Sequence, residues 1–394
     1  MELKPGYKQT EIGVIPEDWD FIQLKKCIDL KNGYAFQSAF FSNRGEVLLT
    51  PGNFSRTGGL QFDSNNTKRY NGKFPKDSVL SYGDLLLVMT DLTPDCKLLG
   101  KPAIVKTKET FLHNQRIAKV VNNQRKAVNG FLFYVFLSEH YLRYLKERAT
   151  GSTVRHTSLR IISSFRTALP PKKEQIAVSK TLFDIDSLIT SLEKLIEKKK
   201  FIKHGVMQEL LTGTRRLPGF SGEWETKRLG DFFALQYGKP KKESDRVKTA
   251  GVPVYGSNGV VGYSSDKLTS NPTIIIGRKG AAGLVHHSSG GCWPIDTTFY
   301  IEFDDYTESL FYYYLLQCAG LDRIKSDSAV PGLNRADAYA LMITVPSKEE
   351  RIQIAEILLS IDQEITYLTD SLDKHKLLKQ AMMQELLTGR IRLV

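Results

Sequence analysis

The sequence predicts a mixed α+β protein built as two similar halves, each a globular domain followed by a long amphipathic helix. Three observations carry this prediction: a duplicated segment, coiled-coil spacing of apolar residues within it, and short β-type runs between turn residues in the rest of each half. With 394 residues, the chain exceeds the usual size of a single hydrophobic core, which agrees with two domains.

The duplication is strongest near the end of each half. An offset of 176 residues aligns 170–217 with 346–393 without a gap, and 22 of the 48 positions are identical. The block Met-Gln-Glu-Leu-Leu-Thr-Gly at 207–213 recurs unchanged at 383–389. Shared helical composition alone does not produce such a match, so the chain contains an internal repeat.

A weaker match joins the beginnings of the two halves. At an offset of 205, residues 18–24 align with 223–229, and Gly33 aligns with Gly238. Between these ends the halves differ in sequence and in length. Because loops vary while a scaffold is kept, we expect one common scaffold that presents two different recognition surfaces.

Each repeat contains apolar residues at alternating steps of three and four, which is typical of a coiled-coil seam. Proline before each run and glycine after it mark the helix ends. We therefore predict a first domain at 1–168, a first helix at 169–217, a second domain at 218–345 and a second helix at 346–394, with the two matching seams packed together. The seam residues are Leu182, Ile185, Ile189, Leu192 and Ile196 in the first helix and Leu358, Ile361, Ile365, Leu368 and Leu372 in the second.

The charge balance favours a polyanionic partner. The chain carries a net charge of +12, and clustered Lys and Arg gain affinity by releasing counterions from phosphate. A membrane surface or RNA would attract such a chain as well. No run of about 18 apolar residues and no signal-peptide core occur, so we expect a cytoplasmic protein. The four cysteines lie far apart, which predicts neither a disulfide framework nor a zinc site.

The motifs of common enzymes are missing from the sequence. The segment 277–283 lacks the spacing of a phosphate loop, and no Gly-x-Gly-x-x-Gly follows a predicted strand. No Asn-Pro-Pro-Tyr or Asp-Pro-Pro-Tyr run of the kind used by amino-methylating enzymes occurs. The adjacent His286 and His287 point apart and are expected to bind no metal. We therefore predict a non-catalytic chain without a metal or cofactor of its own.

Polar and cationic residues in predicted loops are the candidate nucleic-acid contacts, although a solvated charged face is the commoner explanation for any single one of the first-half residues. Asn and Gln can pair with adenine, Arg with guanine or phosphate, and Tyr can stack on a base. The candidates in the first half are Lys97, Lys101, Asn114, Gln115, Arg116, Arg155 and His156. The candidates in the second half are Tyr255, Ser257, Asn258, Arg278, Lys279, Asn334 and Arg335.

Several short motifs follow one another in a specific order along the duplicated chain. They are Leu-Pro-Pro-x-x-Glu-Gln at 169–175 with an echo at 345–351, the two Gln-Glu-Leu-Leu-Thr-Gly ends, Arg-Leu-Pro-Gly-Phe at 216–220 before Trp224, Asn-Gln-Arg at 114–116, Pro-Val-Tyr-Gly-Ser-Asn-Gly at 253–259, Gly-Arg-Lys-Gly at 277–280 and Ser-Ala-Val-Pro-Gly-Leu-Asn at 328–334. In this order the motifs resemble the specificity subunits of type I restriction-modification enzymes over essentially the full length. The first half departs from the pattern at 151–158, which lacks Pro-Gly-Leu-Asn.

This resemblance implies a DNA sequence-specificity subunit that is not itself catalytic. Each domain would be a target-recognition domain reading one half of a bipartite double-stranded DNA site. Two antiparallel helices would set the spacer between the half-sites and dock two methyltransferase (modification) subunits. S-adenosylmethionine on those subunits, and ATP and Mg²⁺ on motor-nuclease subunits, would supply the chemistry.

Two other functions remain open on the sequence. A specificity subunit of a fused restriction-methylation system outside type I would have nearly the same sequence features. A coiled-coil scaffold that binds only proteins would explain the repeat but not the polar, glycine-rich loops.

Overall fold

The structure is a computed structural model that describes residues 5–93, 95–122, 126–324 and 332–393. It contains two compact units: a first unit of residues 1–191 with 373–394, and a second unit of residues 192–372. Each unit combines one globular domain with parts of both long helices. The predicted α+β class is confirmed, whereas the domain boundaries at 168, 217 and 345 stay a prediction.

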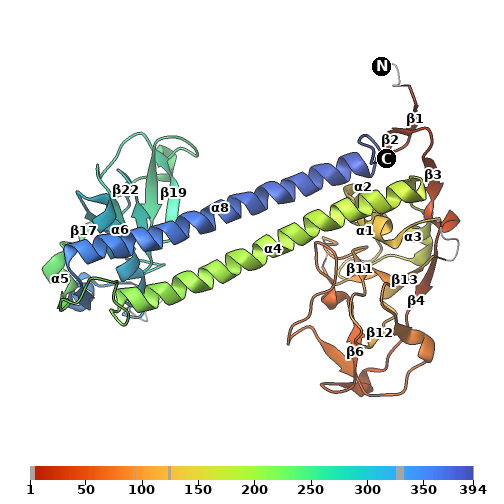
Figure 1. Ribbon diagram of the computed structural model, residues 1–394, viewed down its shortest axis with the longest axis horizontal. Coiled ribbons are helices and arrows are strands. Elements are labelled where there is room, and N and C mark those ends of the chain that lie inside the picture. The colour runs from red at the N-terminus through yellow and green to blue at the C-terminus, as the bar shows by residue number, and fades with distance from the viewer. Residues whose placement is uncertain (1–4, 94, 123–125, 325–331, 394) are drawn as a thin grey trace. The chain divides into compact units, whose positions relative to one another are not determined.

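The two long helices are α4 (Lys172–Leu211) and α8 (Lys348–Leu386), and each is one unbroken ribbon in Figure 1. Each helix begins in one unit and ends in the other. Of the predicted seam residues, six are buried and four are half-buried. The buried ones are Leu182, Ile185, Ile189, Ile196, Leu358 and Leu372, and the half-buried ones are Leu192, Ile361, Ile365 and Leu368.

Within the second unit, ion pairs show that the helices run antiparallel. Lys199 Nζ lies 2.7 Å from Glu364 Oε2, and Lys203 Nζ lies 2.6 Å from Asp362 Oδ1. Rising residue numbers on α4 thus meet falling numbers on α8. The sequence resemblance implied this antiparallel arrangement.

The first domain contains a four-stranded antiparallel sheet of order β11-β9-β13-β4 and a five-stranded sheet of order β5-β7-β6-β12-β8, in which β12 runs parallel to β6. Its strands are β1 (Tyr7–Thr10), β2 (Gly13–Pro16), β3 (Asp20–Gln23), β4 (Asp29–Asn32), β5 (Phe41–Ser42), β6 (Glu46–Leu49), β7 (Lys68–Tyr70), β8 (Val79–Leu80), β9 (Leu85–Val88), β10 (Thr90–Asp91), β11 (Pro102–Ile104), β12 (Phe111–His113), β13 (Ile117–Val121), β14 (Arg155–His156) and β15 (Arg166–Leu169). Its helices are α1 (Asn129–Leu137), α2 (Glu139–Arg148) and α3 (Leu159–Ser164).

The second domain repeats this topology with fewer strands. Its four-stranded antiparallel sheet has the order β21-β20-β23-β17, and its smaller sheet pairs β18 in parallel with β22 and antiparallel with β19. The strands are β16 (Glu225–Arg228), β17 (Gln236–Tyr237), β18 (Val252–Gly256), β19 (Gly259–Ser264), β20 (Thr273–Gly277), β21 (Val285–Ser288), β22 (Trp293–Pro294), β23 (Thr298–Glu302) and β24 (Met342–Val345). The helices are α5 (Leu229–Phe232), α6 (Tyr306–Cys318) and α7 (Arg335–Ala340).

The ends of the long helices are part of the domain cores. In the first unit, Phe131 of α1 belongs to the same buried cluster as Leu182 of α4 and Leu386 of α8. In the second unit, Phe311 of α6 shares a cluster with Leu358 of α8 and Leu211 of α4. The position of each four-stranded sheet is thereby fixed against both helices within its own unit.

Candidate nucleic-acid interface

In the first domain, three connections between strands meet at one end of the four-stranded sheet. The turn at 114–116 joins β12 to β13, and its Arg116 carbonyl accepts a hydrogen bond of 2.9 Å from Met89 N in the β9–β11 connection. That connection contains β10, which pairs with β14 so that Asp91 lies opposite Arg155. The turn, the β9–β11 connection and β14 therefore form one surface region, which holds all seven predicted first-half contacts.

In the second domain, the equivalent connections meet in the same way. Arg278 N, just after β20, donates to the Thr297 carbonyl at 2.8 Å, and Leu333 N donates to the Arg278 carbonyl at 2.8 Å. The β18–β19 turn adjoins them, because the Ser257 carbonyl lies 3.2 Å from Nε2 of His286 on β21. Four connections thus converge, although they are far apart in the sequence.

Three pairs of matching backbone hydrogen bonds make the turns 114–116 and 295–297 equivalent. Inside the turns, Ile117 N donates to Asn114 O and Thr298 N donates to Ile295 O, both at 3.0 Å. From the neighbouring strand, the residue after the aligned glycine donates to the end of β12 or β22: Tyr34 N to His113 O at 2.8 Å, and Lys239 N to Pro294 O at 3.0 Å. In the third pair, Met89 N donates to Arg116 O and Arg278 N donates to Thr297 O, as described above.

The glycines Gly33 and Gly238 explain why this geometry recurs. A Cβ atom at Gly33 would lie 2.3 Å from the Asn114 carbonyl oxygen, and one at Gly238 would lie 2.1 Å from the Ile295 carbonyl oxygen. Only glycine allows the two backbones to approach so closely. The alignment of these two glycines is the sequence signal that could have located the turn at 295–297, which our sequence analysis missed.

The first-domain candidates differ in whether their side chains are held by contacts within the protein or are exposed to solvent. Asn114 Oδ1 accepts from Arg116 N at 2.9 Å and so holds the turn, whereas Gln115 and Arg116 are exposed. Lys97 forms an ion pair of 2.7 Å with Asp95, and this hydrogen bond lowers the pKa of the Asp95 carboxyl. Gln115 and Arg116 are therefore the best-placed side chains for a base or phosphate.

The remaining first-domain candidates are Lys101, Arg155 and His156. Burial lowers the pKa of Lys101, which is half-buried. Arg155 Nη1 donates to the Gly151 carbonyl at 2.6 Å, and His156 Nδ1 lies 3.1 Å from Thr90 Oγ1. The first contact lies within the 150–156 segment, and the second joins this segment to the β9–β11 connection.

In the second domain, the structure corrects one candidate. Tyr255 is only 9% exposed and donates its hydroxyl to the His287 carbonyl at 3.1 Å, so its ring cannot stack on a base. Tyr255 shares a buried cluster with Ile275 and Cys292, which the glycines beside it in the sequence did not reveal. Asn258 and Lys279 are exposed, and Ser257 is half-buried. Asn334 accepts from Ala336 N at 3.1 Å and caps α7.

Two cationic candidates gather around a tyrosine that the sequence did not single out. The guanidinium carbon of Arg278 lies 5.1 Å from the centre of the Tyr237 ring, and that of Arg335 lies 5.0 Å from it. The ring itself is 47% exposed. Stacking on an aromatic face orders each guanidinium while leaving its charge available to phosphate. The motif residues 328–331 lie outside the described residues.

Within the part of the chain that the structure describes, no group of three or more His, Cys, Asp or Glu side chains is placed to hold a metal ion. Cys27, Cys292 and Cys318 are free thiols. Among the same residues, no helix has the length and apolar character needed to cross a membrane.

Comparison with known proteins identifies the same scaffold. The profile of the type I restriction modification DNA specificity domain matches residues 16–201 and 221–374. The putative type I restriction enzyme MjaX specificity subunit of Methanocaldococcus jannaschii is 25% identical over 98% of this chain and 97% of its own length. The MjaVIII specificity subunit of the same organism is 29% identical, and the match covers 54% of this chain and half of that relative. Among solved structures, the S subunit of a type I restriction-modification system from M. genitalium has a similar fold, with a TM-score of 0.66, 18% identity and 98% of each chain covered.

Proposed function

The chain belongs to the type I restriction modification DNA specificity family and is a DNA sequence-specificity subunit, and from this premise we propose that each of its two domains reads one half of a bipartite site. The observation that carries the proposal is the pair of equivalent loop clusters around 114–116 and 295–297. The backbone hydrogen bonds of the two clusters match, whereas their side chains differ. One scaffold that presents two different polar surfaces suits the recognition of two unlike sequences.

An exchange of one domain tests this division of labour. Residues 225–345, from β16 to β24, would be replaced by the corresponding segment of a relative, so that both long helices stay unchanged. We expect the selected DNA motif to change in one half only, with the spacer and the other half retained. A change in both halves would argue against independent reading by the two domains. Selection of bound duplexes from a randomised DNA library measures the motif.

The long helices are proposed to set the spacer, because each begins in one unit and ends in the other. Seven residues inserted after Ser191 and after Leu372 would keep the apolar seam in phase. At about 1.5 Å per residue the insertion adds roughly 10 Å, or about three base pairs of DNA. We expect a longer spacer with both half-sites unchanged; an unchanged spacer would refute the role of the helices.

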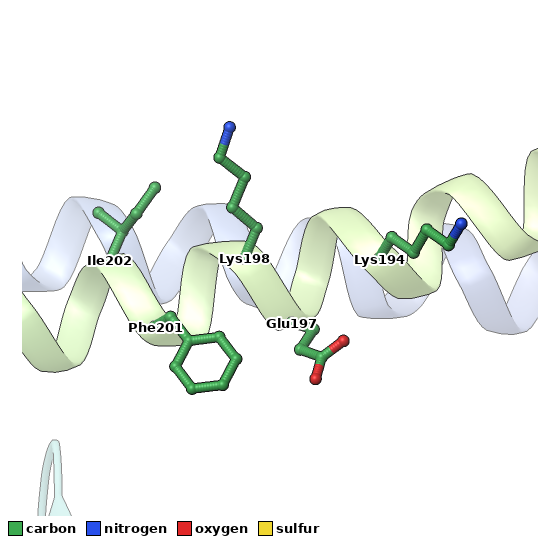
Figure 2. Close-up of a pocket in the computed structure, with 5 residues that line it drawn as sticks. All are labelled: Lys194, Glu197, Lys198, Phe201 and Ile202. Carbon is green, nitrogen blue, oxygen red and sulfur yellow. The ribbon is translucent and has the colours of Figure 1, made fainter. Parts of the chain in front are cut away.

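The proposed surface for the modification subunits is a repeated pair of exposed apolar residues on the long helices. On α4, Phe201 is 70% exposed and Ile202 42% exposed; on α8, Leu377 and Leu378, at the same repeat positions, are 68% and 50% exposed. Figure 2 shows Phe201 and Ile202 projecting from α4 among charged neighbours that include Lys198. Adjacent exposed apolar side chains that recur at the same repeat positions suit an interaction surface, and two equivalent pairs suit two copies of one partner.

Substitution of one pair tests this surface. Phe201→Asp with Ile202→Asp should reduce the complex from two modification subunits to one, and the same change at Leu377 and Leu378 should release the other copy. The matched control is Tyr367→Asp, because Tyr367 is 73% exposed on α8 but has serine at its repeat position. Native mass spectrometry counts the subunits. Retention of both copies in the fourfold variant would exclude this surface.

Catalysis is proposed to come from the partners. Modification subunits would bring S-adenosylmethionine, and motor-nuclease subunits would bring ATP and Mg²⁺, in the cytoplasm where the chromosomal DNA lies. The chain alone should neither transfer methyl groups nor hydrolyse ATP, and both activities should appear when the partners are added. Methyl transfer by the purified chain would contradict this part of the proposal.

A further inference from the structure

The equivalent turns carry different side chains at the same exposed position. The matching hydrogen bonds of turns 114–116 and 295–297 place Gln115 and Asp296 at the same place in the two domains, and both are exposed. In the second domain the turn is held firmly. The backbone N and the Oγ1 of Thr298 both donate to the Ile295 carbonyl, the latter at 2.7 Å, and Arg278 Nη1 donates to the Asp296 carbonyl at 3.2 Å.

The setting of Asp296 is cationic. Arg278 bonds its backbone, Lys279 is exposed on the same connection, and Arg335 shares the ring of Tyr237 with Arg278. A carboxylate among these cations repels phosphate and so weakens binding to every DNA sequence. A carboxylate suits a DNA-binding surface when it makes a hydrogen bond that only some DNA sequences can offer.

The chemistry of the two side chains identifies that contact. A carboxylate only accepts hydrogen bonds, and in the major groove the donors are the exocyclic amino groups of bases, with cytosine N4 as the usual partner of Asp. The Gln115 amide both donates and accepts, which suits adenine.

We propose that Asp296 determines specificity in the second domain by accepting a hydrogen bond from the amino group of one base, cytosine in the first place, and that Gln115 reads one base at the equivalent position of the other half-site. The proposal rests on the DNA-specificity function of the chain. Beyond that function, the proposal assigns the difference between the two DNA half-sites to one position of the protein, occupied by Gln115 in the first domain and Asp296 in the second.

The test compares three variants of the full-length chain, assayed with and without the modification subunits of the same strain. Asp296→Asn keeps the shape of the side chain but adds a donor, and Gln115→Glu makes the opposite change in the first domain. The matched control is Asp304→Asn, because Asp304 is an exposed acid of the same domain beyond the far end of β23. Each protein selects duplexes from a randomised library, and affinities for single-base variants of the selected motif are then measured.

Asp296→Asn should change the preference at one position of the second half-site, towards adenine, with a loss of discrimination of roughly 5- to 100-fold there. Gln115→Glu should change one position of the first half-site, and the control should select the original motif. An unchanged motif with tighter binding to all sequences would show that Asp296 merely repels phosphate, and would overturn the proposal. A starting protein that selects no motif would count against the DNA-specificity function itself.

Discussion

Tyr314 on α6 donates its hydroxyl to Oδ2 of Asp362 on α8 at 2.7 Å, and Lys203 of α4 lies 2.6 Å from the other oxygen of this carboxylate. The same three-residue contact exists in the first unit. There Tyr134 of α1 donates to Asp186 of α4 at 2.8 Å, and Lys379 of α8 lies 2.5 Å from Asp186. Each contact joins a domain helix to both long helices within its unit.

Loss of either tyrosine hydroxyl should lower the stability of the unit that contains it. Burial, reinforced by the neighbouring carboxylate, raises the pKa of Tyr314, so the hydroxyl stays protonated and remains a donor. Tyr314→Phe should lower the free energy of unfolding by about 1 kcal/mol, the usual contribution of one hydrogen bond. Tyr134→Phe should have a similar effect, and Tyr367→Phe, at a 73% exposed ring, should have none. Denaturant unfolding measures all three; equal stabilities would show that the contact does not contribute.

Two arginines at repeat-equivalent positions hold the starts of the long helices. Arg392, near the C-terminus, donates to Glu174 of α4 at 2.7 Å and to Asp18 at 2.8 Å, and Arg216 donates to Glu350 of α8 at 2.8 Å. Both glutamates are 1% exposed. Because removal of one partner leaves a buried charge, Arg392→Ala and Arg216→Ala should each lower the thermal midpoint.

The two arginine substitutions should differ in size. Glu174 keeps a hydrogen bond of 3.0 Å from Trp19 Nε1, whereas Trp224 Nε1, the counterpart in the second unit, has no partner among the residues that the structure describes. Arg216→Ala should therefore destabilise more than Arg392→Ala. Arg390→Ala is the control, because the Arg390 side chain is 62% exposed. Calorimetry measures the thermal midpoints. A midpoint for Arg390→Ala as low as those of Arg216→Ala and Arg392→Ala would contradict the argument.

The second domain should lose stability in mild acid through His287. Burial lowers the pKa of His287 to about 4, and its Nε2 lies 2.8 Å from Ser309 Oγ. The unfolded chain, with a histidine pKa of about 6.5, takes up the proton first as the pH falls, so the contribution of neutral His287 is lost between about 6.5 and 4.

Thermal midpoints measured at a series of pH values test whether stability falls as the pH falls. From about pH 7.5 down to about pH 5, the midpoint of the unaltered chain should fall more steeply than that of His287→Gln, which cannot take up the proton. His204→Gln, at an exposed position on α4, should keep the original slope. If the thermal midpoints of the unaltered chain and of His287→Gln fell with pH at the same slope, His287 would not be the cause of the loss of stability in acid.

The sequence predicts the long helices because their signal is local. Apolar spacing, proline and the repeated Thr-Gly ends placed the helices at 169–217 and 346–394, and the structure has them at Lys172–Leu211 and Lys348–Leu386. A seam repeats every few residues, so a short window of sequence contains it. The identical positions in the repeat also include residues whose contacts recur in both units, such as Asp186 and Asp362.

Which strands of the two globular domains are equivalent could not be read from the sequence. The connection between β6 and β7 runs from residue 50 to 67, while the equivalent β18–β19 turn is residues 257–258. Such insertions break any alignment of the strands, although the hydrogen-bonded order of the sheet is kept. That order and the matching backbone hydrogen bonds of the two turns show that Gln115 and Asp296 are equivalent.

By itself, the sequence determined the duplication, the two long helices, the basic character of the chain and the family it resembles. The tertiary structure decided which loop residues lie together, that Tyr255 is buried, and that Asp296 lies where Gln115 lies in the other domain. The physical reason is the range of the interactions. Helix periodicity acts between residues three or four apart, whereas the recognition surface is formed by strands far apart in the sequence, such as β4 and β13, which pair Asp29 with Val121 through backbone groups common to every sequence.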